Sequence, residues 1–217
     1  MTDLTNLIGH VISEVPSNRI KILDLGSGWI NSKIELLLLK YRNVFNYTAV
    51  DINTPYSIFS REPNDDIQSF QEVTIADWVQ KINHSLSYNE ENQYEEINET
   101  EFNEMFRLEF GKDAFEYCRE NVSKEKNDII VISNLLHFLD RQIADELVSL
   151  CISMLNEGGI IYISVFNDEQ TQYQRKNPYS RKDFETLKKG LQIIEENNQA
   201  SLHHELLGRK IAAYNSG

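Results

Sequence analysis

The chain has few cysteines, and this shortage excludes two ways of stabilising a protein. Its 217 residues include only two, Cys118 and Cys151, with no CxxC pair and no cluster of histidines beside them. This pattern argues against a disulfide framework and against a structural zinc site, so no metal is expected. We expect both thiols to be reduced and to lie in or just beneath the core.

Basic residues and long apolar runs are also scarce. The chain has 21 basic against 34 acidic side chains and a formal net charge of -13. A protein that binds along DNA or RNA must neutralise phosphates, so we expect no nucleic-acid partner. The longest apolar runs, such as "IELLLL" and "GGIIYISVF", fall short of the roughly 20 residues of a membrane helix. The N-terminus has no basic segment followed by an apolar one, so we expect a soluble, cytoplasmic protein.

The chain has enough apolar residues to form one hydrophobic core. A hydrophobic fraction of 41% over this length predicts a single domain spanning residues 1–217. From residue 20 to about residue 165, apolar runs of strand length alternate with longer amphipathic stretches, which is typical of a parallel sheet covered on both faces. The candidate strands are residues 19–26, 47–52, 70–77, 128–134 and 158–166.

Helices are predicted between these strands. Residues 34–41 and 141–155 have helical spacing, and Ser32 with Glu35 forms a capping box that predicts a helix start just after Ser32. Residues 179–190 indicate a short helix with Ser180 as its cap and Gly190 as its end. Two strands follow that are close enough to pair antiparallel. The predicted fold class is therefore α/β: a Rossmann-like, doubly wound, mostly parallel seven-stranded sheet with one antiparallel edge strand and helices on both faces.

One stretch interrupts the alternation. Residues 83–101 are rich in Asn and Glu, and residues 102–122 have apolar side chains at roughly helical intervals. We expect an insertion at about 83–127, made of an acidic loop and one or two amphipathic helices split at Gly111. Such a segment is either a solvated excursion or a lid over a site, and both stay open.

The stretch "KILDLGSGWINSK", residues 21–33, combines a strand, two glycines and a helix start. Gly26 and Gly28 let the backbone approach a ligand at the carboxyl edge of the sheet. A Walker phosphate loop is excluded, because no Gly-Lys-Ser/Thr follows at the required spacing. A dinucleotide loop needs a third glycine where this chain has Asn31, and the carboxylate of Asp24 would oppose a pyrophosphate.

Two carboxylates point to another ligand. Asp24 suits a ligand that brings a positive group to the loop, although it would also suit capping of the loop's own amides. Asp51 ends the second candidate strand, where a carboxylate can accept hydrogen bonds from both hydroxyls of a ribose. Two acids and two glycines describe a site for a nucleoside with a cationic tail.

With these residues the sequence resembles the class I S-adenosylmethionine-dependent methyltransferases, in order over about residues 3–215. Its first to fifth motifs resemble "ILDLGSG", "AVDI", "IADW", "DIIVISNLLHFLD" and "LNEGGIIYISVF", and residues 180–197 resemble its last helix and strand. The family's first motif commonly has a further glycine where this chain has Ile30. The resemblance implies methyl transfer from S-adenosylmethionine, with S-adenosylhomocysteine as product.

Carried over position by position, the resemblance implies a donor site. The backbone of Gly26, Ser27 and Gly28 would lie against the methionine part of the donor, with Asp24 near its ammonium group. Asp51 would hold the ribose.

The same resemblance implies residues for the adenine and for the acceptor. Ile52 would pack on the adenine, and Asp77 with Trp78 would meet its exocyclic amine and ring face. Asn134 would line the methyl-transfer site. An acceptor hydroxyl or ammonium must lose a proton, and a base within reach would help. The candidate bases are His137, Tyr173 and Tyr179.

The charge pattern leaves the acceptor open. Six Glu between residues 90 and 101 would favour a cationic amine or a basic peptide. A basic patch would favour a carboxylate or phosphate; it consists of Arg175, Lys176, Arg181 and Lys182. Three functions stay open: a methyltransferase that acts on the O, N or S atom of a small molecule, a peptide or protein methyltransferase, and a non-catalytic S-adenosylmethionine-binding or interaction protein of the same fold.

Overall fold

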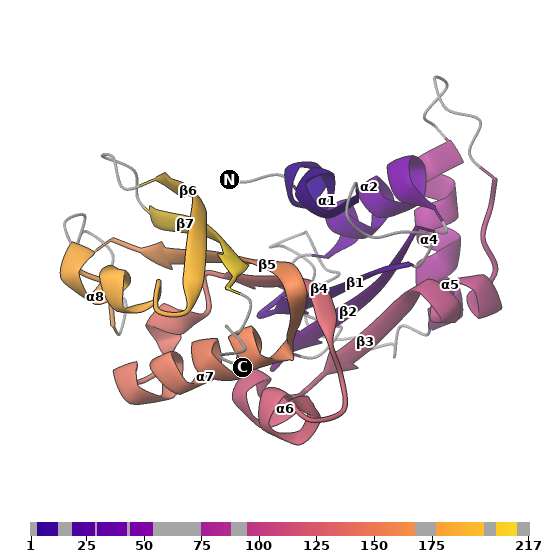
Figure 1. The fold of residues 1–217 in the computed structure, drawn as a ribbon. Helices are drawn as coiled ribbons and strands as arrows, with labels where there is room; N and C mark the ends of the chain where they lie inside the picture. The colour runs from indigo at the N-terminus through magenta and orange to yellow at the C-terminus, as the bar shows by residue number, and fades with distance from the viewer. Residues whose placement is uncertain are drawn as a thin grey trace.

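A computed structural model describes most of the chain. The described residues are 4–12, 19–28, 30–42, 44–53, 75–87, 95–167, 177–197 and 203–211. In this part of the chain a seven-stranded sheet lies between two layers of helices (Figure 1). No helix of the described residues is both long and apolar enough to span a membrane.

The strand order in the sheet is β3-β2-β1-β4-β5-β7-β6. The strands are β1 (Ile20–Leu25), β2 (Phe45–Asp51), β3 (Phe106–Phe110), β4 (Asn127–Ser133), β5 (Leu155–Phe166), β6 (Leu191–Asn197) and β7 (His203–Lys210). The first five pair in parallel, whereas β7 is antiparallel to both β5 and β6. The predicted fold class is confirmed, with the reversed strand β7 one place in from the edge that β6 forms.

Helices cover both faces of the sheet. They are α1 (Leu4–Ile12), α2 (Asn31–Tyr41), α4 (Ile75–Ser87), α5 (Glu99–Met105), α6 (Ala114–Asn121), α7 (Arg141–Met154) and α8 (Arg181–Thr186), with a 3-10 turn η1 (Leu136–Phe138). One buried cluster joins α1, α2, α4 and α5 to the sheet, and a second joins α6, α7 and α8 to its other face. Strand β1 contributes side chains to both clusters, because Ile22 faces the first cluster and Leu23 faces the second.

The third strand lies elsewhere than the sequence predicts. The strand predicted over residues 70–77 is wrong for residues 75–77, which begin α4, and residues 70–74 lie outside the described part. The third strand is β3, which pairs in parallel with β2 from Tyr47 opposite Phe106 to Asp51 opposite Phe110. Within the range expected to be an insertion, 83–127, the structure thus has α5, β3 and α6, which belong to the sheet and its helices.

The predicted helix ends are only partly right. Helix α7 ends at Met154, one residue before the predicted end, and α8 ends at Thr186 although it was predicted to run to Gly190. The start of α8 is as predicted, after a capping box of Ser180 and Asp183. Helix α2, in contrast, begins at Asn31, and its N-cap is Ile30 with no side-chain capping bond. The capping box predicted at Ser32 is therefore wrong, because Ser32 already lies inside the first turn.

The two cysteines lie face to face between helices. Cys118 of α6 and Cys151 of α7 are free and fully buried, with their Sγ atoms 4.0 Å apart. Burial, together with the neighbouring Cys118, raises the pKa of the Cys151 thiol well above its usual value. Both thiols belong to the second buried cluster, which confirms the prediction of free core cysteines.

Candidate functional site

Three neighbouring strands bring predicted site residues to one edge of the sheet. Strand β1 lies between β2 and β4, and all three run in the same direction. The loop with Gly26 and Gly28 follows β1, Asp51 ends β2, and Asn134 follows β4. The carboxyl ends of parallel strands meet at one edge, and ligands of such sheets bind there.

The loop after β1 needs its two glycines. The φ angles of Gly26 and Gly28 are 65° and 55°, a region that L side chains rarely adopt. A Cβ atom at Gly26 would lie 3.1 Å from Cβ of Leu135, in the loop after β4. The amide of Gly26 donates to the carbonyl of Val50 at 2.9 Å. The loop is therefore packed closely between the ends of β2 and β4.

Ile30 does not need to be a glycine. Its φ of -94° is ordinary for an L residue. Its side chain is fully buried in the first cluster, together with Ile34 and Leu37 of α2. The side chain therefore anchors the start of α2 in the core.

Asp51 both ends β2 and holds the glycine loop. Its Oδ2 accepts a hydrogen bond from the amide of Gly28 at 2.9 Å. Its Oδ1 accepts from the backbone and side-chain nitrogens of Asn53, both at 2.8 Å. Oδ2 keeps the capacity to accept one more hydrogen bond. The next residue, Ile52, is 67% exposed, so an apolar surface lies beside this carboxylate.

Asp24 is buried and neutralised by a lysine. Its Oδ2 accepts hydrogen bonds from the Tyr47 hydroxyl and from Nζ of Lys33, both at 2.5 Å. Burial, with the charge of Asp24, raises the pKa of Tyr47 well above its usual value. Lys33 also donates to the carbonyl of Ser27 at 3.0 Å. Lys33 therefore supplies a charge opposite to that of Asp24, which reduces the expected repulsion between this carboxylate and a pyrophosphate.

Sequence reasoning missed Lys33. The signal was its position in the first turn of the helix that follows the glycine loop, from which a long side chain can reach back. The alternative role of Asp24, capping of the loop's own amides, finds no support in its hydrogen bonds. Its partners among the described residues are a hydroxyl and an ammonium group.

Three buried oxygen atoms at this edge have no hydrogen-bond partner among the described residues. They are Oδ1 of Asp24, Oγ of Ser27 and Oδ1 of Asn134. Asn134 also has a φ of 56° and is the one non-glycine residue of the described chain with a positive φ. A buried polar atom without a partner costs about 1–3 kcal/mol. A polar ligand that supplies hydrogen-bond donors would fit these atoms.

The loop after β3 also reaches this edge. The amide of Lys112 donates to the carbonyl of Asp51 at 3.2 Å, and the amide of Gly111 donates to the carbonyl of Asn53 at 3.4 Å. Asp113 then caps α6 by accepting from two of its amides. Sequence reasoning missed residues 111–113, because the preceding residues 106–110, which form β3, had been predicted to be helical.

Two of the three residues predicted to bind adenine, Asp77 and Trp78, lie on α4. Their assignment rested on the likeness of "IADW" to the third motif of the family, and the strand predicted to end in this motif is replaced by α4. Their side chains lie outside the described part of the structure, so their role stays a prediction.

The candidate bases are packed rather than open. His137 is fully buried in η1, with its ring against Phe138 and Phe166 at centroid distances of 4.2 and 4.7 Å. Tyr179 is fully buried, with the guanidinium of Arg141 3.5 Å over its ring. Burial raises the pKa of Tyr179, and the charge of Arg141 offsets this only in part.

Tyr173 lies outside the described residues. The amide of Asn177 donates to the carbonyl of His137 at 3.1 Å, so the loops after β4 and β5 meet here. The described residues contain no group of three or more His, Cys, Asp or Glu that could hold a metal ion.

No protein-family model matches the chain, and no curated protein matches it in sequence. Solved structures match it in fold. N-methyltransferase NodS from Bradyrhizobium japonicum WM9 has a TM-score of 0.54 at 13% identity, covering 96% of this chain and 94% of that one. 1,6-didemethyltoxoflavin-N1-methyltransferase from Burkholderia thailandensis has a TM-score of 0.55 at 15% identity, covering 96% and 76%.

An O-methyltransferase family 2 protein from Planctomyces limnophilus, in complex with apigenin, has a TM-score of 0.51 at 17% identity. It matches 95% of this chain, which spans 58% of that protein. Structures of NodS and of the toxoflavin enzyme contain S-adenosylhomocysteine. At these identities the likeness concerns the fold alone. The chain therefore has the fold of the class I S-adenosylmethionine-dependent methyltransferases.

Proposed function

We propose that this protein is an S-adenosylmethionine-dependent methyltransferase that acts on the O, N or S atom of a small molecule. The observation that carries the proposal is the set of unpaired buried oxygens beside the glycine loop, on Asp24, Ser27 and Asn134. Solved proteins of the same fold contain S-adenosylhomocysteine at identities of 13% and 15%. A small-molecule acceptor is favoured because two of the similar structures contain 1,6-didemethyltoxoflavin and apigenin.

The described residues would hold such a donor along the sheet edge. Asp24 and Ser27 offer acceptors to the ammonium group of the methionine part, since their free oxygens are buried and unpaired in the described chain. Asp51 offers Oδ2 to the ribose hydroxyls, and the exposed side chain of Ile52 offers an apolar surface to the adenine. Residues 111–113 lie next to Asp51 and would border the adenine.

The bound donor supplies a methyl group activated by a sulfonium. The chain's task is then to align the acceptor and to exclude water. Asn134, which follows β4, would orient the acceptor through its unpaired Oδ1. Of the candidate bases, His137 is favoured over Tyr179, because a raised pKa disfavours the Tyr179 phenolate near neutral pH. Tyr173 stays a candidate from the sequence.

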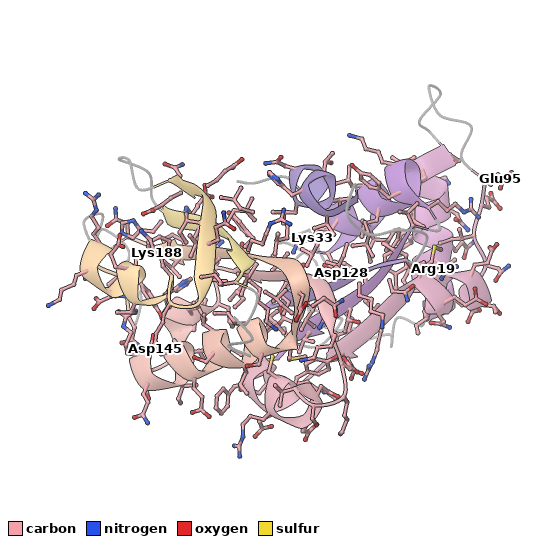
Figure 2. All side chains as sticks on the ribbon, viewed as in Figure 1. Arg19, Lys33, Glu95, Asp128, Asp145 and Lys188 are labelled. Carbon is pink, nitrogen blue, oxygen red and sulfur yellow. The ribbon has the colours of Figure 1, made fainter. Side chains whose placement is uncertain are left out.

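Calorimetric titration with S-adenosylmethionine, S-adenosylhomocysteine and NAD tests the donor. We expect both sulfur compounds to bind and NAD not to bind. Asp51→Ala should weaken binding by about tenfold or more, because it removes a charged acceptor and the bond that holds Gly28. The matched control is Asp145→Ala, at an exposed carboxylate of α7 (Figure 2). Binding of NAD in place of the sulfur compounds would contradict the proposal.

A turnover assay tests the acceptor. Methyl transfer from labelled S-adenosylmethionine is measured with a panel of small amines, hydroxyls and thiols and with a panel of peptides. We expect products with small molecules alone. Products with peptides alone would indicate a peptide methyltransferase, and donor binding without any product would indicate a non-catalytic protein.

A further inference from the structure

Asp24 and Lys33 form an ion pair that leaves, in the described part of the chain, an unpaired oxygen atom on Asp24 and one unused N–H on Lys33. Oδ2 of Asp24 accepts from both the Tyr47 hydroxyl and Nζ of Lys33, which uses its two lone pairs. Oδ1 of Asp24 is the unpaired oxygen described above. Nζ of Lys33 donates to Asp24 and to the carbonyl of Ser27. An ammonium group has three N–H bonds, so its third has no acceptor among the described residues.

The unused N–H of Lys33 is within reach of a ligand. The Lys33 side chain is 28% exposed, whereas that of Asp24 is 1% exposed. Lys33 also lies in the first turn of α2, whose N-cap Ile30 makes no side-chain capping bond. The positive end of this helix and the ammonium charge act in the same direction, and both favour an anion beside the glycine loop.

We propose, on the basis of the proposed function, that Lys33 binds the carboxylate of the donor's amino-acid part, beside an ammonium group that is bound by Asp24. In an α-amino acid the positive ammonium group and the negative carboxylate group are bonded to the same carbon atom. The Asp24–Lys33 pair presents the complementary charges next to each other. Because two hydrogen bonds already hold Nζ, its third N–H points in a defined direction, which favours a charge-assisted hydrogen bond.

Lys33 is then a specificity-determining residue. It distinguishes a donor that has a carboxylate from one that lacks it. The rival interpretation is that Lys33 takes the place of the donor's ammonium group and must leave when the donor binds. The two interpretations predict opposite effects of removing the lysine charge. If Lys33 competes with the ammonium group, its removal should strengthen donor binding. If Lys33 binds the carboxylate, its removal should weaken donor binding.

The test compares S-adenosylmethionine with its decarboxylated form by calorimetry. The wild-type protein should bind S-adenosylmethionine about tenfold or more tightly than the decarboxylated form. Lys33→Met should bring this ratio close to one. The matched control is Lys40→Met, at an exposed lysine in the last turn of the same helix, which should keep the wild-type ratio. Lys33→Arg keeps the positive charge and should restore part of the preference.

The ratio is measured on one variant at a time, so a partial loss of folded protein affects both ligands equally. Lys33→Met leaves the buried Asp24 carboxylate without its partner and is expected to be less stable. The double variant Asp24→Asn/Lys33→Met removes both charges, and its ratio should also be close to one. It provides the measurement if Lys33→Met does not fold.

An unchanged ratio in Lys33→Met, or tighter binding of both ligands, would overturn the role of Lys33 and leave the proposed function standing. If the wild-type protein binds neither S-adenosylmethionine nor S-adenosylhomocysteine, the proposed function is overturned, and the role of Lys33 with it.

Discussion

At the scale of single residues, the backbone conformation at the sheet edge is as specific as the side chains. Gly26 and Asn134 both have a positive φ, and they follow the neighbouring strands β1 and β4. Leu135 lies against Gly26, so the two loops shape each other. Strained backbone of this kind is common at ligand-binding sites, where the surrounding structure holds it in place.

Gly26→Ala should lower the free energy of unfolding by about 1–2 kcal/mol or more. Its φ of 65° disfavours a Cβ atom, and that atom would lie 3.1 Å from Cβ of Leu135. The matched control is Gly9→Ala in α1, where nothing lies within 4 Å of the new Cβ. There we expect a gain of up to about 1 kcal/mol. Urea denaturation measures both, and equal stability of Gly26→Ala and the wild type would contradict the loop conformation.

Two substitutions at Asn134 separate backbone strain from the role of the side chain. Both remove the unpaired Oδ1, but Asn134→Gly tolerates the φ of 56° and Asn134→Ala does not. Asn134→Ala should therefore be less stable than Asn134→Gly by about 1 kcal/mol. Under the proposed function, both variants should lose turnover alike. Full turnover in Asn134→Gly would show that the side chain has no part in the reaction.

At the scale of elements, β3 shows where the sequence pattern is ambiguous. "FRLEF" alternates apolar and charged residues as an exposed edge strand does, but its aromatic residues also continue the helical spacing of the segment before it. In the structure Phe106 packs on Phe45 and Phe102, with centroid distances of 5.3 and 4.7 Å. Pairing with β2, which the local pattern does not reveal, makes this segment a strand.

The charges on β3 predict an acid-sensitive contribution to stability. Oε1 of Glu109 lies 2.6 Å from Nε of Arg107, and Oε2 lies 2.6 Å from Nζ of Lys112. Burial alone would raise the pKa of Glu109, but hydrogen bonds from Lys112 and Arg107 outweigh it and lower the pKa below its usual 4.5. A carboxyl with a lower pKa in the folded state stabilises that state above its unfolded pKa. This stabilisation is lost as the pH falls through the folded pKa.

Below pH 4.5 the free energy of unfolding should therefore fall more steeply in the wild type than in Glu109→Gln. Chemical denaturation at neutral pH and at several lower pH values measures the two slopes. Glu146→Gln, at an exposed position in the middle of α7, is the matched control and should follow the wild type. Identical slopes for Glu109→Gln and the wild type would mean that these ion pairs are too screened to contribute.

At the scale of the whole molecule, two buried clusters on opposite faces of one sheet tie the structure together. Cys118 and Cys151 lie in the second cluster, between α6 and α7, and both are fully buried. The thiolate is the form that reacts, and burial raises the pKa of Cys151. The two thiols therefore report on unfolding of the whole domain.

Alkylation of the two thiols should be at least about a thousandfold slower in the native protein than in denaturant, given a typical stability of about 5–15 kcal/mol. Mass spectrometry of protein quenched at successive times after adding iodoacetamide measures both rates. Rapid labelling of either cysteine in the native protein would show that α6 and α7 separate without global unfolding.

The sequence by itself determined that Asp24, Gly26, Gly28, Asp51 and Asn134 share one edge. Buried parallel strands are continuous apolar runs, so residues at or just after the end of such a run lie at the carboxyl end of its strand. Only the tertiary structure decided the partners of these residues, such as Lys33 for Asp24 and the Gly28 amide for Asp51. It also decided which segment is the third strand. These contacts join segments that are separate along the chain, so they exist only once the sheet has formed.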